Sequence, residues 1–233
     1  MRLSKRLEAV AGFVPPGKVV ADIGTDHAYL PVYLVRTGRS PRVIATELNA
    51  KPWERARFWV RSYGLEDKIE VRLGSGLEAL SPGEAQVAVV AGLGGNTIKE
   101  LLAATPLVFN RLEKLILQPM ADAGDLRLWL VDNGWRLADE ALVEEGGRLY
   151  VVIAAEQGKE STEDRFLIAI GPRLAEKGGP VFISYLEGLK RNYRRILSGL
   201  ERSRSPDAQE KAIRLTAELA KIREVLARYA GES

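Results

Sequence analysis

The 233-residue chain has no cysteine and a single histidine, His27. The absence of cysteine excludes disulfide scaffolds, thiolate zinc sites and thiol nucleophiles. One histidine excludes catalysis that needs two, and we expect no metal site. No apolar run approaches the roughly 18 residues of a membrane span, and the charged N-terminus lacks the apolar core of a signal peptide. We therefore expect a soluble, cytoplasmic protein without a membrane partner.

The chain also has little net charge, because 34 Lys and Arg stand against 31 Asp and Glu, giving +3. This balance excludes a polybasic tail protein, and the 46% hydrophobic content excludes a disordered one. Residues 1–156 carry 19 basic and 20 acidic side chains, whereas residues 157–233 carry 15 and 11. The basic excess therefore lies in the C-terminal third, where a solvated surface is the simplest explanation.

Short runs rich in valine, isoleucine and leucine alternate with helical patterns over the first 156 residues. Such βα repeats predict an α/β fold with a buried parallel sheet. A Gly-rich break at 145–147 predicts a closing antiparallel hairpin. This order is typical of a class I, Rossmann-like methyltransferase, because a dehydrogenase sheet would add another parallel strand. The expected strands are 18–23, 43–47, 69–73, 86–91, 114–118, 135–144 and 148–156, and the expected helices are 28–37, 51–63, 95–104 and 122–133.

The C-terminal residues follow a different pattern, in which apolar residues recur at alternating spacings of four and three over 182–200 and again over 208–229. Each set forms a heptad seam, the apolar stripe of a coiled-coil helix. Between the seams, Ser205 suits a helix cap and Pro206 the first helical position. The pattern predicts an antiparallel coiled-coil hairpin closed by a short turn at 203–207. We expect a methyltransferase domain at 1–157 and a helical domain at 158–233, with 162–179 unassigned. Since the seams can pair within or between chains, we expect a monomer or a weak homo-oligomer.

The sharpest local signal runs from Val19 to Pro31, where an apolar strand ends in Asp22, turns at Gly24 and enters a helix. Such turns at the carboxyl edge of a parallel sheet bind nucleotide-like ligands, because glycine admits a ligand and the helix offers free N–H groups. The pattern is not Gly-x-Gly-x-x-Gly. The carboxylate of Asp26 would repel a diphosphate but suits the cationic groups of S-adenosylmethionine. Asp26 is also expected to cap the helix.

Further candidate ligand positions follow the other strands. Glu47 ends the second strand, where an acid accepts hydrogen bonds from both ribose hydroxyls of an adenosine. The loop 74–77 is suited to hold an adenine ring, and the three glycines within 92–95 exceed the needs of a tight turn. Gln118 ends the fifth strand and either reads a base edge or caps the next helix. The expected cofactor-binding residues are Asp22, Gly24, Thr25, His27, Ala28, Glu47, Leu48, Gly74, Ser75, Gly76, Leu77, Ala91, Gly92, Leu93 and Gly94.

Several motifs resemble those of the bacterial tRNA (adenine-22-N1)-methyltransferases. Asp-Ile-Gly-Thr-Asp-His-Ala-Tyr-Leu-Pro at 22–31 is similar to their signature, and Leu-Ile-Leu-Gln-Pro at 115–119 also matches. Ala-Gly-Leu-Gly-Gly at 91–95 resembles their Ala-Gly-Met-Gly-Gly, with Leu93 in place of methionine. The resemblance covers most of the chain. It departs at Ser75, where the family often has aspartate and where serine would hydrogen-bond the adenine amino group only weakly.

The resemblance implies methyl transfer from S-adenosylmethionine to N1 of adenine 22, in the D-stem region of tRNA. Adenine N1 already holds an in-plane lone pair, so the main task of the protein is to place the base in line with the sulfonium. The candidate catalytic residues are Asp26, whose charge would favour the cationic product, and Tyr29, which would stack on or position the base. Core packing is the alternative role for Tyr29. A paired adenine must leave its stack to reach such a pocket.

Binding of tRNA requires a basic surface and would depend on salt. Aromatic residues are interleaved with the basic residues of 51–63, and we expect them in the core rather than in base stacking. The expected RNA-binding residues are Arg2, Lys5, Arg6, Arg57, Arg61, Lys190, Arg191, Arg194 and Arg195. Two alternatives stay open, a small-molecule methyltransferase of the same fold and a tRNA-binding module without catalysis.

Overall fold

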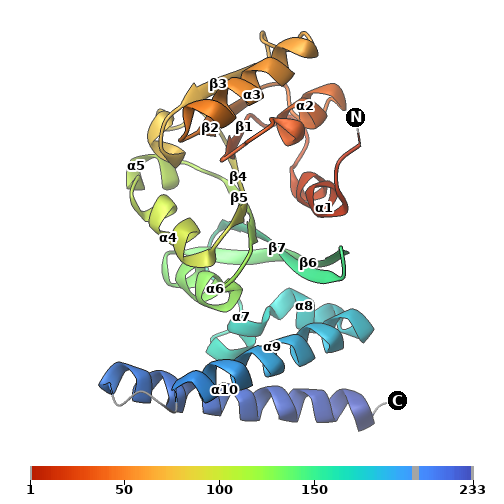
Figure 1. Ribbon diagram of the computed structural model, residues 1–233, viewed down its shortest axis with the longest axis vertical. Coiled ribbons are helices and arrows are strands. Elements are labelled where there is room, and N and C mark those ends of the chain that lie inside the picture. Colours follow the sequence, from red (N-terminus) through yellow and green to blue (C-terminus); the bar gives the residue numbers. More distant parts are fainter. Residues whose placement is uncertain (1, 201–204, 232–233) are drawn as a thin grey trace. The chain divides into compact units, whose positions relative to one another are not determined.

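The computed structural model describes residues 2–200 and 205–231, and the chain divides into two compact units, Met1–Glu163 and Asp164–Ser233. A seven-stranded sheet in the order β3-β2-β1-β4-β5-β7-β6 forms the first unit (Figure 1). Strands β1 to β5 are parallel, β7 is antiparallel to β5, and β6 is antiparallel to β7. The predicted Rossmann-like sheet with its closing hairpin is therefore confirmed. The strands are β1 Val20–Ile23, β2 Val43–Glu47, β3 Ile69–Leu73, β4 Val87–Leu93, β5 Lys114–Pro119, β6 Trp135–Glu145 and β7 Arg148–Gln157.

Helices cover both faces of this sheet. On one face, Val10 of α1, Leu34 of α2 and Val60 of α3 join the strand side chains in one hydrophobic core. Helices α4, α5 and α6 lie on the other face (Figure 1). Every residue of β1 and β2 is buried, as the apolar runs predicted. The helices of this unit are α1 Lys5–Phe13, α2 Tyr29–Arg36, α3 Ala50–Ser62, the 3-10 helix η1 Gly76–Ala79, α4 Gly95–Ala103, α5 Pro106–Phe109 and α6 Ala123–Asp132.

A buried ion pair fastens the closing hairpin to the helical layer. Nε of Arg127 on α6 lies 2.6 Å from Oε1 of Glu140 on β6, and both side chains are fully buried. Breaking a buried ion pair by removing one partner typically destabilises a protein by about 3–5 kcal/mol. The pair therefore ties β6 to α6, while β7 joins the hairpin to the parallel strand β5.

The second unit contains α7 Arg165–Ile170, α8 Pro172–Lys177, α9 Gly179–Leu200 and α10 Pro206–Gly231. Helices α9 and α10 pack together, and the ring of Tyr229 near the end of α10 meets Phe182 near the start of α9 at 6.0 Å. The two helices are therefore antiparallel, and several residues at the predicted heptad positions, among them Leu186 and Leu219, are buried. The hydroxyl of Ser205 accepts a hydrogen bond from the backbone N–H of Ala208 at 3.2 Å, so it caps α10. Of the expected turn, Ser203 and Arg204 lie outside the described residues.

Along the chain, the boundary between the two units falls between Glu163 and Asp164, six residues beyond the boundary expected from sequence. In the part of the chain that the structure describes, no helix has the length and apolar character needed to cross a membrane.

Candidate active site

The turn after β1 lies where the strand order of the sheet reverses, between β2 and β4. Ligands bind at such switch points in open parallel sheets. The backbone is left-handed at Gly24 (φ +75°), Asp26 (φ +49°) and Ala28 (φ +56°). Non-glycine residues in this conformation typically cost about 1–3 kcal/mol and cluster at ligand sites. A side chain at Gly24 would meet no protein atom within 4 Å, so open space lies over this glycine.

Glu47 at the end of β2 holds this turn in place. Its Oε1 accepts a hydrogen bond from the backbone N–H of Asp26 at 2.8 Å, and its Oε2 accepts one from the N–H of Leu48 at 3.1 Å. The Glu47 side chain is nearly buried, while Leu48 stands exposed beside it. Because an ionised carboxylate has about four acceptor positions, each oxygen retains capacity for a ribose hydroxyl.

Asp22, near the end of β1, is a second buried carboxyl at this edge. Its pKa is raised from 3.8 to about 6, mainly by burial; the Thr25 hydroxyl opposes this rise and the nearby charge of Glu47 adds a smaller contribution to it. The charged form of Asp22 is therefore held at a cost, which a cationic ligand would relieve.

The prediction that Asp26 caps α2 is wrong. The helix begins at Tyr29, and its cap residue is Ala28, which makes no side-chain capping bond. The Asp26 carboxylate is engaged elsewhere, with Oδ2 lying 2.7 Å from Nδ1 of His27 and Oδ1 accepting a hydrogen bond from Nη2 of Arg55 at 2.8 Å. Asp26 thus joins the turn after β1 to helix α3.

Tyr29 is 38% exposed, so the alternative that it packs in the core is wrong. Its ring stacks on His27 with centroids 5.1 Å apart and meets the edge of Trp59 at 5.9 Å. The expectation that the aromatic residues of 51–63 lie in the core is also wrong for Phe58, which is 64% exposed, and Trp59 is only half-buried. The structure therefore presents these rings at the surface beside the turn.

The loop after β3 owes its glycines to packing. A Cβ at Gly76 would lie 2.7 Å from the Leu101 side chain, and one at Gly74 would lie 2.9 Å from Cβ of Ala79. The side chain of Leu77 is buried, so this residue can meet a ligand only through its backbone. Ser75 is exposed and makes no side-chain capping bond to η1.

The glycines after β4 are explained by different structural features. Gly92 has a φ of +86° and lies at a shift in the register between β4 and β5. A Cβ at Gly95 would lie 2.6 Å from the carbonyl oxygen of Asp122, so packing requires this glycine. A Cβ at Gly94 would have no neighbour closer than 3.8 Å. A Cβ would thus make only ordinary contacts at Gly92 and Gly94, and Ala91 and Leu93 are half-buried beside them.

Arg6 reaches the same edge, which the sequence did not predict. Its Nη1 donates a hydrogen bond to Oε1 of Gln118 at the end of β5, and it lies 3.6 Å from the position a Cβ would take at Gly92. The guanidinium also lies over the Tyr150 ring at 5.5 Å. Gln118 is fully buried and donates to the carbonyl of Pro119 at 3.0 Å. It does not cap α6, whose cap residue is Asp122.

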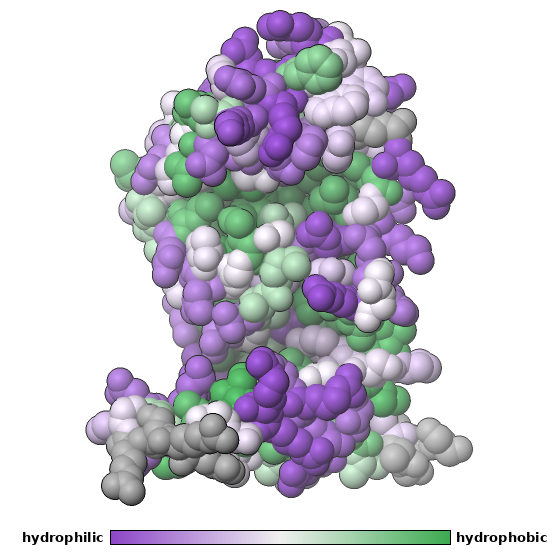
Figure 2. All heavy atoms as spheres, in the orientation of Figure 1, coloured by the Kyte–Doolittle hydropathy of each residue, from purple (hydrophilic) through white to green (hydrophobic). Residues whose placement is uncertain are grey.

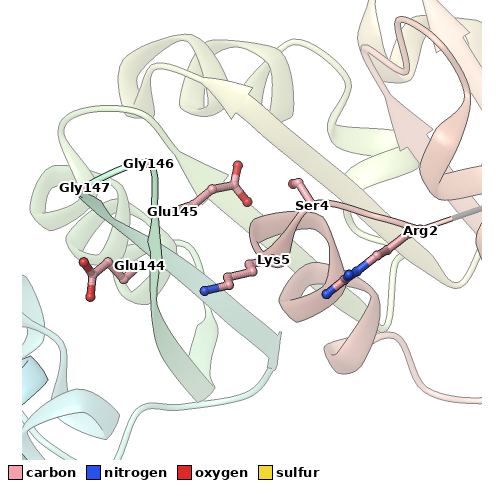
Figure 3. A pocket seen from close by; sticks show the side chains of 7 residues that line it. All are labelled: Arg2, Ser4, Lys5, Glu144, Glu145, Gly146 and Gly147. Atoms are coloured by element: carbon pink, nitrogen blue, oxygen red, sulfur yellow. The ribbon is translucent and has the colours of Figure 1, made fainter.

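The other basic residues near the N-terminus face acidic ones. Arg2 and Lys5 line a hollow of about 530 Å³ together with Glu144 and Glu145 of the hairpin (Figure 3). Glu145 also accepts a hydrogen bond from the backbone N–H of Arg6 at 2.9 Å, and this bond lowers the pKa of its carboxyl. The positive charge of Arg2 and Lys5 is therefore partly balanced.

The remaining expected RNA-binding residues lie on two helices. On α3, Arg57 lies over the Trp53 ring at 4.6 Å, and Nε of Arg61 is 3.6 Å from Oε1 of Glu66. On α9, Lys190 pairs with Glu187 and Arg195 donates to Asn192, and their exposed neighbours are Arg191 and Arg194. Among the described residues, no group of three or more His, Asp or Glu side chains is placed to hold a metal ion.

Comparison with known proteins shows the family to which this chain belongs. The methyltransferase domain family matches residues 3–153. The tRNA (adenine(22)-N(1))-methyltransferase of Bacillus subtilis is 40% identical over 188 residues, covering 78% of this chain and 79% of that protein. This chain belongs to the bacterial tRNA (adenine-22-N1)-methyltransferase family.

Solved structures of the tRNA methyltransferase family share both the sheet and the C-terminal helical unit. The m1A22 tRNA methyltransferase TrmK of Bacillus subtilis matches with a TM-score of 0.86 at 34% identity, covering 97% of this chain and 99% of that chain. A Streptococcus pneumoniae protein in complex with S-adenosyl-L-methionine matches with a TM-score of 0.81 at 35% identity, covering 97% and 100%. Coverage of nearly the whole chain means that the fold of both units is common to these relatives.

Proposed function

We propose that this protein transfers a methyl group from S-adenosylmethionine to N1 of adenine 22 in tRNA. The observation that carries the proposal is the bond between Glu47 Oε1 and the N–H of Asp26, which places a buried acid beside the open turn at Gly24. This arrangement at the switch point of the sheet suits an adenosine ligand. It occurs in a chain that is 40% identical to a tRNA (adenine(22)-N(1))-methyltransferase.

The residues at this edge fit the cofactor. Glu47 retains acceptor positions for the ribose hydroxyls, the space over Gly24 admits the ligand to the backbone, and the buried charge of Asp22 suits a cation. The exposed Ser75 and the backbone of Leu77 are assigned to the adenine end, and Thr25, His27 and Ala28 to the turn. When bound, S-adenosylmethionine supplies an electrophilic methyl group.

The protein contributes position rather than acid–base chemistry, because adenine N1 attacks with its own lone pair. Tyr29 offers a half-exposed ring on which the target adenine can stack. We assign Asp26 as a positioning residue, since its oxygens engage Arg55 and His27, and His27 in turn stacks on Tyr29. Its negative charge beside the adenine also favours the cationic product.

We further propose that the exposed arginines of α3 and α9 contact tRNA phosphates, principally Arg57, Arg191 and Arg194. Arg2, Lys5, Arg61, Lys190 and Arg195 lie near acidic or amide partners and contribute less. Helices α9 and α10 pack against each other within one chain, through contacts such as that between Phe182 and Tyr229. This favours a monomer or weak homo-oligomer, working in the cytoplasm with its tRNA.

The test compares labelled methyl transfer to an unmodified tRNA transcript carrying adenine at position 22 and to the same transcript with guanine there. We expect transfer only to the first. Gly24→Arg should abolish cofactor binding measured by calorimetry, because the new side chain fills the ligand space. Gly17→Arg is the matched control, since Gly17 has a similar φ of +78° and equally open surroundings. Equal transfer to both transcripts, or cofactor binding unaffected by Gly24→Arg, would contradict the proposal.

A further inference from the structure

Helix α3 carries an exposed aromatic surface that the cofactor site does not use. A hollow of about 510 Å³ is lined by Lys51, Glu54, Arg55, Phe58 and Trp59, a volume within the range of small-ligand sites. These residues are spaced i, i+3, i+4, i+7 and i+8, so they form one stripe along the helix. The core side of α3 is provided instead by Ala56 and Val60, which are buried.

Phe58 is the most exposed ring of this stripe, at 64%, and it does not stand alone. Its ring meets Trp59 edge-on at 5.9 Å, and Trp59 stacks with Tyr63 at 6.2 Å. Single exposed apolar residues are ordinary, but here the exposed Phe58 is joined through half-buried Trp59 to Tyr63, which packs against the core. Figure 2 shows hydrophobic side chains standing among hydrophilic ones in the region of α3.

The charge around these rings suits a polyanion. Helix α3 contains Lys51, Arg55, Arg57 and Arg61 against the single acid Glu54. Aromatic rings that alternate with cations are how proteins hold unpaired nucleotides, with rings under the bases and cations at the backbone. A protein partner would require acidic groups on its own surface, whereas RNA supplies bases and phosphates together.

The aromatic surface is continuous with the position assigned to the target adenine. Trp59 contacts both Phe58 and Tyr29, each at 5.9 Å between centroids. Arg55, which lines the hollow, also donates to Asp26 in the turn after β1. A strand that places one base against Tyr29 therefore brings its neighbouring base to the hollow.

We propose that Phe58 and Trp59 form a second nucleobase subsite, which stacks an unpaired base next to the methylated adenine, with Lys51 at the adjoining phosphate. This inference rests on the proposed function for the identity of the RNA. Stacking here stabilises the distorted strand and so favours extrusion of the target base. It also adds contact with a particular tRNA region beyond the general attraction of the basic surface.

The test measures tRNA affinity without turnover, using Phe58→Ala, Phe58→Leu and Phe58→Tyr in the full chain. Alanine and leucine are good helix formers, so α3 is retained. We expect Phe58→Ala and Phe58→Leu to weaken tRNA binding about tenfold, whereas Phe58→Tyr binds normally, because stacking needs an aromatic face. Affinity for S-adenosylmethionine should not change. Leu107→Ala is the control, since Leu107 is 75% exposed on α5.

A fluorescent base reports stacking directly. Transcripts with 2-aminopurine on either side of position 22 should show, at one of the two positions, quenching by the wild-type protein that Phe58→Ala loses. Equal tRNA affinity of Phe58→Ala and Leu107→Ala would overturn the subsite. Equal binding by Phe58→Leu and Phe58→Tyr would show apolar contact without stacking and would also overturn it. Because binding is read without methyl transfer, an inactive wild-type protein would contradict only the proposed function.

Discussion

The guanidinium of Arg6, in the first helix, hydrogen-bonds the buried side-chain amide of Gln118 at the end of the fifth strand. The two residues are 112 positions apart, and their bond joins α1 to the strand ends that border the candidate site. Arg6 therefore belongs to the inner structure of this edge rather than to a freely exposed basic surface.

Replacing Arg6 with alanine is expected to lower the free energy of unfolding by about 1–3 kcal/mol, because the buried oxygen of Gln118 loses its partner. The measurement is urea unfolding followed by circular dichroism. Lys5→Ala, on the exposed side of the same helix, should change stability little. Equal stability of the two variants would show that Gln118 finds another partner.

Asp22 should make cofactor binding depend on pH. Its pKa of about 6 means that the carboxylate becomes protonated as pH falls below 6, which removes the charge that attracts a cationic ligand. We expect the dissociation constant of S-adenosylmethionine to rise as pH is lowered from 7 to 5. Calorimetry with Asp22→Asn provides the control, since this variant should bind weakly at both pH values. A wild-type affinity that is constant over this range would contradict the assignment.

The raised pKa of Asp22 also predicts how the stability of the ligand-free protein depends on pH, in the direction opposite to cofactor binding. Because the folded pKa lies above the unfolded value, Asp22 contributes stability below about pH 4 that is lost as pH rises through 6. At pH 7 the neutral Asp22→Asn variant is therefore expected to be more stable than wild type, by up to about 3 kcal/mol. Thermal unfolding at pH 7 and pH 4 checks this, because the gain should shrink at the lower pH.

Glu47→Gln is expected to weaken cofactor binding roughly 10- to 100-fold, because hydrogen bonds to a charged acceptor are worth about 1.5–3 kcal/mol. The amide oxygen can still accept from the N–H of Asp26, so the fold should persist. Calorimetric titration measures the affinity, and Glu78→Gln, an exposed acid in η1, is the control. Similar affinities for the two variants would remove Glu47 from the ribose position.

The buried and exposed ion pairs of this protein should differ sharply in how much they contribute to the free energy of unfolding. Glu140→Gln breaks the buried ion pair with Arg127 and is expected to cost about 3–5 kcal/mol of stability. Glu113→Gln breaks the exposed pair with Lys18 and should have little effect. Denaturant unfolding of both variants tests the contrast, which would fail if their midpoints coincided.

The sheet could be predicted from sequence because its central strands β1, β2, β4 and β5 are largely apolar runs, and β2 and β3 match their expected bounds. The end of β4 was missed because the strand continues to Leu93 across the left-handed Gly92, where a local pattern indicates a turn. The start of α2 was missed for a similar reason. Ala28 adopts a left-handed conformation, so the helix begins only at Tyr29 and the Asp26 side chain does not cap it.

Long-range contacts account for the other differences. The aromatic residues of α3 have core composition, but Ala56 and Val60 already fill the buried side of the helix, so Phe58 faces outward. The bond between Arg6 and Gln118 has no local sequence pattern, because it depends on how α1 packs on the finished sheet. Sequence motifs therefore indicated the candidate ligand edge, while tertiary packing decided which side chains lie there.

The most direct test of the central claim is mass mapping of an unmodified tRNA transcript after incubation with the protein and S-adenosylmethionine. The account predicts a single added methyl group at N1 of adenine 22, and none with Gly24→Arg. A methyl group on another base or atom, or an unmodified transcript despite cofactor binding, would contradict it.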